Sequence, residues 1–344
     1  MVLIDQATWR PLLEGLLDPA FTLDGATRVV DFNAAAQTLL SLEANRHLVQ
    51  FSRAPELLVA VDTALATGEP QSCELRLIVP MDQMLRVRVT PIARSAQATQ
   101  PVLLVVLRDT TEEQQLAQMR ADFVANASHE LRTPLASLAG FVETLRGAAK
   151  DDAMARDKFL AIMQEQATRM SRLIEDLLSL SRIEMREHVA PRDTVSLAAV
   201  VDELARTLKP LASAAAIEIA ITQDAGPAQV VGDRDELTQV VQNLMQNAIK
   251  YGRNDGRVDV RVLPEGTRIV LQVVDNGIGI APEHLPRLTE RFYRVSAKDS
   301  RERGGTGLGL AIVKHIVNRH RGALQIQSTK GIGSTFSVSL PKPR

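Results

Sequence analysis

Hydrophobic and polar residues alternate along the first part of the chain with the period of β-strands. Strands are predicted at residues 20–23, 28–32, 73–79, 85–91 and 102–108. The turn-forming pair Asp24-Gly25 joins the first two as a hairpin, and helical patterns follow at residues 34–40 and 56–66. Residues 1–110 are expected to form an α+β domain, a small antiparallel sheet with helices on one face. Composition leaves open whether it is a sensory or docking module or a domain without a ligand.

The period changes to that of a helix after residue 111. Two apolar stripes at helical spacing are separated by a loop at residues 147–152, and their members are Leu116, Met119, Phe123, Ala127, Leu131, Leu138, Phe141 and Leu145, then Phe159, Ile162, Gln166, Met170, Leu173, Leu177 and Leu180. Residues 111–188 therefore predict a hairpin of two helices, each ~45 Å long. One partner helix cannot cover so wide an apolar face, so we expect a homodimer that forms a four-helix bundle.

The remainder of the chain, residues 189–344, mixes both periods. Helices are predicted at residues 197–211, 234–249 and 309–320, and strands at 216–221, 257–263, 268–275, 323–328 and 334–340. This pattern is typical of an α/β sandwich of ~150 residues, the size of one domain.

Composition excludes several classes of function. Lys plus Arg number 40 against 41 Asp plus Glu, and 3% of the residues are aromatic, so no nucleic-acid partner is expected. One cysteine, Cys73, excludes an internal disulfide and fits a reducing compartment. The apolar runs are far shorter than the ~20 residues of a membrane helix.

Two glycine-rich segments have the chemistry of a nucleotide pocket. Asp275-Asn276-Gly277-Ile278-Gly279-Ile280 follows an apolar strand, where glycines permit close approach to a planar ligand and the carboxylate can accept a hydrogen bond from the amine of adenine. Gly304-Gly305-Thr306-Gly307-Leu308-Gly309 opens a helix, and N–H groups at a helix N-terminus bind phosphates. A solvated turn explains the first segment equally well when it is taken alone.

Polar side chains of a third segment complete the predicted site. Asn243 and Asn247 lie four residues apart on one helix face, where amide oxygens are suitable ligands for Mg²⁺. Lys250 and Arg294 are candidates for neutralising the terminal phosphates. The alternative is a polar helix face in solvent. The loop between Asp275 and Gly304 is long enough to be a lid over the nucleotide.

These segments, in this order, resemble the ATP-binding domain shared by histidine kinases, gyrase-type ATPases and Hsp90. The stretch from Asn243 to Lys250 and Tyr251 looks like the N box, and Asp275 to Gly279 looks like the G1 box. Arg291-Phe292-Tyr293-Arg294 looks like the F box and Gly305 to Gly309 like the G2 box. The resemblance implies an ATP site at Asn243, Asn247, Lys250, Tyr251, Asp275, Gly277, Gly279, Arg294, Gly305, Thr306, Gly307, Leu308 and Gly309.

The segment Ser128-His129-Glu130-Leu131-Arg132-Thr133-Pro134-Leu135 resembles the H box of sensor histidine kinases. The resemblance implies that His129 accepts a phosphoryl group from ATP and passes it to a response regulator receiver domain. Glu130 can stabilise the imidazolium that develops, and a neutral imidazole is nucleophilic at cellular pH. In the family, a pattern matching Glu130 to Thr133 is associated with dephosphorylation of the regulator, with Thr133 orienting water. Pro134 predicts a kink just past His129.

Residues 1–110 resemble a PAS domain, and the H box with its flanks is most similar to phosphate-regulon sensor kinases. Those kinases usually carry membrane helices ahead of this region. We therefore expect the chain as given to be cytoplasmic. If a further N-terminal segment precedes it, we expect the protein to be tethered to the membrane and to have a membrane-associated signalling partner. The alternative function is a catalytically inactive dimeric scaffold for signalling.

Overall fold

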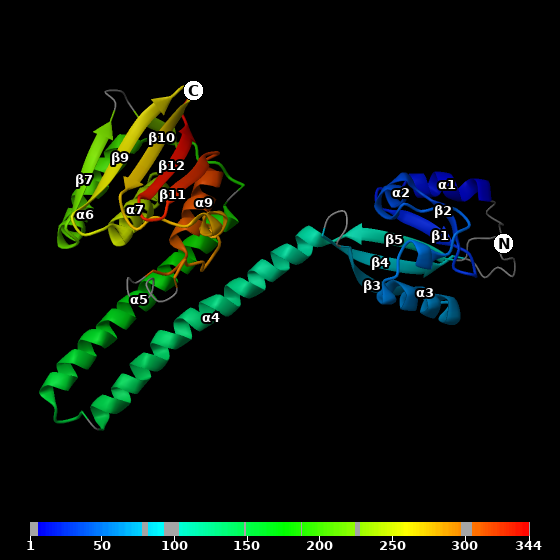
Figure 1. Ribbon diagram of the computed structural model, residues 1–344, viewed down its shortest axis with the longest axis horizontal. Helices are drawn as coiled ribbons and strands as arrows, with labels where there is room; N and C mark the ends of the chain where they lie inside the picture. Colours follow the sequence, from blue (N-terminus) through cyan, green and yellow to red (C-terminus); the bar gives the residue numbers. More distant parts are fainter. Residues whose placement is uncertain are drawn as a thin grey trace. The chain divides into compact units, whose positions relative to one another are not determined.

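The computed structural model describes residues 6–77, 82–92, 103–147, 149–186, 188–223, 228–296 and 305–343. It divides into two compact units, Met1–Val124 and Ala125–Arg344 (Figure 1). Each unit is an arrangement of helices and strands with its own core. None of the described helices combines the length and the apolar character needed to cross a membrane.

The first unit is built on a five-stranded antiparallel sheet in the order β2-β1-β5-β4-β3. Its elements are α1 Gln6–Glu14, β1 Ala20–Leu23, β2 Val29–Phe32, α2 Ala34–Leu40, η1 Leu48–Gln50, α3 Pro55–Thr67, β3 Gln71–Leu77, β4 Gln83–Pro91 and β5 Leu103–Asp109. Alternate residues of β4 and β5, such as Val87 and Val105, join Leu57 and Val61 of α3 in one core. The predicted hairpin at Asp24 is confirmed, since β1 pairs with β2. Helix α1 was not predicted.

Asn33 ties three segments of this unit together. Its side chain is 2% exposed and caps α2 by accepting from the backbone N–H of Ala36 at 2.9 Å. The same oxygen accepts from Ala20 of β1 at 3.0 Å. Its amide nitrogen donates to the carbonyls of Leu13 and Asp18, at 3.2 and 2.9 Å. One side chain thereby satisfies backbone groups that burial would otherwise leave unpaired.

The first turn of α4 is hydrogen-bonded to the start of β4. Thr110 donates to the carbonyl of Met84 through its backbone N–H at 2.8 Å and through its hydroxyl at 3.1 Å. The Thr111 hydroxyl accepts from the Met84 N–H at 2.8 Å. The hydroxyl of Thr111 also lowers the pKa of Asp109, which keeps that carboxylate ionised at the sheet end. These hydrogen bonds join the end of the sheet to the start of α4.

The predicted helical pair is formed by α4 Thr111–Arg146 and α5 Ala153–Met185, and the second unit begins at Ala125 within α4. Asp152 caps α5 by accepting from Ala155 at 2.9 Å, and the rings of Phe141 and Phe159 stack across the hairpin at 5.2 Å between centroids. Helix α4 is assigned without interruption through Pro134. The kink expected there stays a prediction.

The rest of the second unit is a two-layer α/β structure (Figure 1). Its elements are β6 Thr194–Ser196, α6 Leu197–Ala214, β7 Ile217–Gln223, β8 Gln229–Val231, α7 Arg234–Tyr251, β9 Gly256–Glu265, β10 Arg268–Asp275, η2 Pro282–Arg287, α9 Gly309–Arg319, β11 Ala323–Thr329 and β12 Gly333–Pro341. The main sheet has the order β11-β12-β10-β9-β7 and is antiparallel except for the β7–β9 pair. Alternate residues of β9 are buried, which matches one face covered by helices. The three-residue strands β6 and β8 and the 3-10 helix η2 were not predicted.

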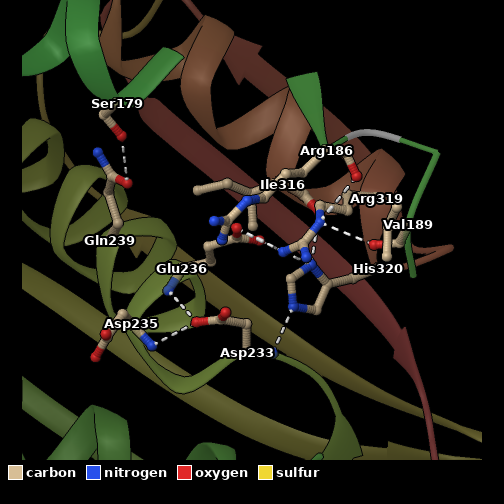
Figure 2. A network of polar contacts seen from close by, with 10 residues as sticks. All are labelled: Ser179, Arg186, Val189, Asp233, Asp235, Glu236, Gln239, Ile316, Arg319 and His320. Atoms are coloured by element: carbon tan, nitrogen blue, oxygen red, sulfur yellow. Dashed lines mark hydrogen bonds and ion pairs between the residues drawn. The ribbon is translucent and has the colours of Figure 1, made fainter. Parts of the chain in front are cut away.

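A buried polar cluster fastens the end of α5 to this layer (Figure 2). Arg319 of α9 donates to the backbone carbonyls of Arg186 and Val189 at 3.2 and 3.0 Å, and forms an ion pair with Glu236 of α7 at 2.5 Å. The neighbouring His320 accepts from the backbone N–H of Asp233 at 3.0 Å. The segment that follows α5 is therefore held by α9 and by the start of α7.

Replacing Asn33 is expected to destabilise the first unit. Asn33→Ala removes a helix cap and leaves buried carbonyls unpaired, which costs about 2–4 kcal/mol. Asn33→Asp should be at least as damaging, because an oxygen then faces those carbonyls. The thermal transition of this unit measures the loss. The exposed Gln37→Ala on α2 is the control and should stay within ~0.5 kcal/mol; equal stability of Asn33→Ala and the control would contradict the assignment.

The second unit is expected to lose stability on mild acidification because of His320. Burial lowers the pKa of His320 in the folded state, whereas an unfolded histidine has a pKa of about 6.5. The unfolded chain therefore binds the proton more readily as pH falls below ~6.5, and folding stability declines from there down to the lowered folded pKa. His320→Gln should flatten this decline. Thermal unfolding of both proteins between pH 5 and 7.5 measures it, and identical pH profiles would refute the role of His320.

Candidate nucleotide and phosphate-acceptor site

Helix α7 presents two asparagines beside its buried face. Leu237, Val241 and Leu244 face the core, whereas Asn243 and Asn247 are half-buried on successive turns. The Asn243 amide nitrogen donates to the carbonyl of Gln239 at 3.0 Å, which turns its oxygen outward. That oxygen lies so close to Gly309 that a Cβ added there would be 2.6 Å from it. The start of α9 and the amide of Asn243 thus adjoin each other, as the predicted site requires.

Asp275 ends β10 with a buried carboxylate. The side chain accepts from the backbone N–H of Gly277 at 2.9 Å, and burial raises its pKa, with the Gly277 and Ser334 backbones acting in the opposite direction. A Cβ on Gly277 would lie 2.3 Å from the carbonyl oxygen of Tyr251. Gly279 has a φ of +62°, and a Cβ there would lie 2.0 Å from the carbonyl oxygen of Thr329. Both glycines are therefore required because the backbone of the protein itself packs against them. The sequence predicts them only for the close approach of a planar ligand.

The glycine-rich segment at residues 305–309 leads directly into α9. Gly307 has a φ of +76°, and its carbonyl accepts from the Phe292 N–H at 2.8 Å. Leu308 is fully buried and occupies the N-cap position of α9 without a side-chain cap. The Leu308 side chain therefore does not accept hydrogen bonds from the first N–H groups of α9. Such N–H groups at a helix N-terminus can donate to a bound anion. Gly304 lies outside the described residues.

Lys250 and Tyr251 lie at the end of α7. The Lys250 ammonium is 5.4 Å from the centre of the Tyr251 ring, and the Tyr251 carbonyl accepts from the Ile278 N–H at 3.3 Å. The end of α7 is thereby joined to the segment after Asp275. The predicted N-box and G1-box residues are adjacent for this reason.

Thr306 and Arg294 connect the glycine-rich segment to the helical hairpin. The Thr306 hydroxyl donates to Asp176 of α5 at 2.7 Å. Burial raises the pKa of Asp176, and the Thr306 hydroxyl opposes that rise. Arg294 donates to the carbonyl of Thr306 and to Glu130 of α4, both at 2.9 Å. Asp176 was missed by sequence analysis, because a single carboxylate within a long helix carries no local signal of a distant partner.

The predicted acceptor His129 is exposed on α4, next to a carboxylate that is engaged elsewhere. Glu130 accepts from Arg169 of α5 at 3.2 Å as well as from Arg294. The Thr133 hydroxyl donates to the carbonyl of His129 at 3.2 Å, one turn back along the helix. Thr133 therefore lies beside His129 as expected, while Glu130 is directed toward α5 and Arg294. Arg169 was also missed from sequence.

The polar groups of the site are suited to bind a nucleotide together with a metal ion. The Nε of Arg294 is buried and has no hydrogen-bond partner among the described residues, so a donor is available beside the glycine-rich segment. No group of three His, Cys, Asp or Glu side chains within the described ranges could hold a metal. A metal here would rest on amide oxygens, water and phosphate, which suits Mg²⁺.

Comparison with known families matches two regions of the chain. Residues 119–186 match the model described as the His Kinase A (phospho-acceptor) domain. Residues 232–344 match the model described as histidine kinase-, DNA gyrase B- and HSP90-like ATPase. The two regions contain the predicted acceptor and all of the predicted nucleotide residues.

Individual relatives agree with these matches. The chain is 44% identical over 235 residues to the phosphate regulon sensor protein PhoR of Pseudomonas aeruginosa, covering 68% of this chain and 53% of the relative. It is 36% identical over 240 residues to the sensor protein kinase WalK of Staphylococcus saprophyticus, covering 69% of this chain and 39% of the relative. This chain therefore spans about half or less of those relatives.

Two solved structures share the fold. Histidine kinase ThkA, crystallised in complex with the response regulator protein TrrA, superposes with a TM-score of 0.54 at 20% identity, covering 97% of this chain and 98% of that one. The Acinetobacter baumannii histidine kinase AdeS gives a TM-score of 0.51 at 26% identity, covering 63% of this chain and 98% of its own. With the phospho-acceptor segment, the ATPase segment and the similarity to PhoR and WalK taken together, the chain belongs to the sensor histidine kinases.

Proposed function

We propose that this chain phosphorylates His129 from ATP and passes the phosphoryl group to an aspartate of a response regulator receiver domain. The observation that carries the proposal is the contact of the glycine-rich segment with the helical hairpin. Thr306 and Arg294 of the ATPase region hydrogen-bond to Asp176 and Glu130, and Glu130 adjoins His129 in the chain. A nucleotide bound at that segment has the acceptor helix as its immediate neighbour.

The proposed reaction uses the neutral imidazole of His129. The lone pair of one ring nitrogen forms the N–P bond while the bond from phosphorus to the bridging oxygen breaks, and its electrons leave with ADP. The proton on the other ring nitrogen passes to a base, the role proposed for Glu130. Exposure of His129 suits an acceptor that serves its own ATPase domain and then a separate receiver domain.

Each nucleotide group has a proposed partner. Asp275 accepts from the adenine amine, beside Gly277 and Gly279. The phosphates receive the N–H groups of Gly305, Thr306, Gly307, Leu308 and Gly309 and the cations of Lys250 and Arg294. Tyr251 lines the adenine side. Mg²⁺ would bind the oxygens of Asn243 and Asn247 and neutralise phosphate charge during transfer.

The helical hairpin is proposed to form a homodimeric four-helix bundle. Large apolar side chains are exposed on both of its helices, among them Leu135, Val142, Leu160, Ile174 and Leu178. An apolar surface of that extent on a hairpin is stabilised when a second copy covers it. These five residues lie outside the apolar stripes predicted from the sequence, so they widen the apolar surface of the hairpin.

Residues 1–110 are proposed to be a PAS-like sensory domain, and the signal is proposed to belong to phosphate regulation. The sheet with α2 and α3 on one face supports the first proposal, and the similarity to PhoR supports the second. The hydrogen bonds that Thr110 donates to Met84 and that Thr111 accepts from it offer a route by which the sheet can bias α4. The inactive scaffold has no support, because the matched domains retain both the acceptor and the nucleotide residues.

Incubation of the chain with γ-labelled ATP and Mg²⁺ is expected to label His129. The label should be acid-labile, as a phosphorus–nitrogen bond is, and His129→Ala should reduce it by at least ~100-fold because no other group supplies the nucleophile. The exposed His188→Ala is the matched control and should label like the wild type. A wild-type protein that remains unlabelled, or a His129→Ala protein that is labelled normally, would contradict the proposal.

Thr133→Ala is expected to slow dephosphorylation of a phosphorylated receiver domain by ~10-fold or more while leaving His129 labelling intact. The Thr133 hydroxyl donates to the His129 carbonyl, so its lone pairs remain to accept from and orient the attacking water. Thr144 makes the same contact with Gly140 farther along α4, and Thr144→Ala is the control. Equal phosphatase rates for the two variants would rule out this role for Thr133.

A further inference from the structure

One oxygen of Glu130 receives two guanidinium groups. Arg294 donates to Oε2 at 2.9 Å and Arg169 donates to the same atom at 3.2 Å. The three side chains are 8%, 20% and 25% exposed for Arg294, Arg169 and Glu130. Such shielded charge-assisted contacts orient a carboxylate more firmly than surface pairs do.

The two arginines differ in what else they can bind. Arg294 also donates to the Thr306 carbonyl in the glycine-rich segment, and its Nε is buried without a partner among the described residues. Phosphates at that segment would compete with Glu130 for this guanidinium. Arg169 comes from the middle of α5, and Glu130 is the partner that its described contacts give it. Nucleotide binding therefore draws on Arg294 and leaves Arg169 in place.

Helix geometry explains why Glu130 needs such a partner. Adjacent residues on a helix do not face each other, so the Glu130 carboxylate is not directed to the His129 ring by the backbone alone. A carboxylate that lost both cations would also be free to rotate into solvent. A fixed cation on α5 limits where that carboxylate can lie.

Building on the proposed kinase activity, we propose that Arg169 is a positioning residue for Glu130. It holds the carboxylate at the α4–α5 face when Arg294 moves from Glu130 to the phosphates of the nucleotide. Glu130 then accepts the proton released from the second ring nitrogen of His129 as the N–P bond forms. Arg169 acts through Glu130 and touches neither the nucleotide nor the imidazole.

The kinetic test compares Arg169→Ala, Arg169→Lys and Arg294→Ala in the full chain with Mg-ATP. Arg169→Ala should lower kcat for His129 labelling by ~10- to 100-fold with the KM for ATP within about twofold of wild type, and Arg169→Lys should recover part of the loss. Arg294→Ala should raise KM as well. Arg156→Ala, on the same helix and paired with Asp157 at the surface, should behave like the wild type. A rise in KM with unchanged kcat for Arg169→Ala would overturn the inference.

Coupling to Glu130 is tested in the Glu130→Gln background. There, Arg169→Ala should cause no further fall in kcat, and the loss in melting temperature of the double variant should be smaller than the sum of the single losses. Additive losses in either measurement would overturn the role of Arg169. The thermal measurement needs no catalysis, so it tests the Arg169–Glu130 contact even if wild type fails to label, a result that would count against the proposed function alone.

Discussion

The ion pair between Glu130 and Arg294 joins the two halves of the proposed chemistry, and the rest of the site depends on it. Glu130 adjoins His129, the proposed acceptor, on α4, whereas Arg294 lies in the segment that leads to the glycine-rich turn. The same guanidinium holds the Thr306 carbonyl, and the Thr306 hydroxyl holds Asp176 of α5. Four side chains from four segments thus bring the backbone that is proposed to bind phosphate to the helix that carries His129. A polar contact suits this place because a bound phosphate can exchange with a carboxylate for the same donor.

Two kinds of contact hold the ATPase region against the helical hairpin, and they differ in strength. At the end of α5, Arg319 binds two linker carbonyls and a nearly buried Glu236, and α9 packs along the same helix. Breaking such a buried ion pair by removing one partner typically costs about 3–5 kcal/mol. The contacts of Glu130 and Thr306 are more exposed, and charged hydrogen bonds of this kind contribute about 1.5–3 kcal/mol each. The region is therefore anchored firmly at the linker and held more weakly beside His129.

Local patterns in the sequence predicted most elements, while the contacts between them required the structure. The strand β10 and the helix α2 were predicted at their observed bounds, and α7 was short by two residues, because both periods are strong there. Strands β6 and β8 have three residues each, too few for a period to emerge. Helix α1 has nine residues and contains Pro11, which is unfavourable inside a helix, so its sequence favours no element. Glycine spacing indicated Gly277 and Gly279, but the reason for them, close approach of Tyr251 and Thr329, lies in tertiary packing.

The proposed site residues that the sequence predicted share one property that the missed residues lack. Asn243, Asp275 and the glycines occur in short segments, and the few residues around each of them are enough to indicate a nucleotide site. Arg169 and Asp176 are half-buried on α5, at helical spacing from the buried Leu173 and Leu180, and in the sequence each is one of several charged residues within a long helix. Their partners, Glu130 and Thr306, are 39 and 130 residues away along the chain. The first pairing depends on how α4 packs against α5, and the second on how the glycine-rich segment meets the hairpin. A sequence motif can indicate the groups that react, whereas the groups that orient them depend on packing between helices. Positioning residues are therefore found among the structural partners of Glu130 and not within the H box itself.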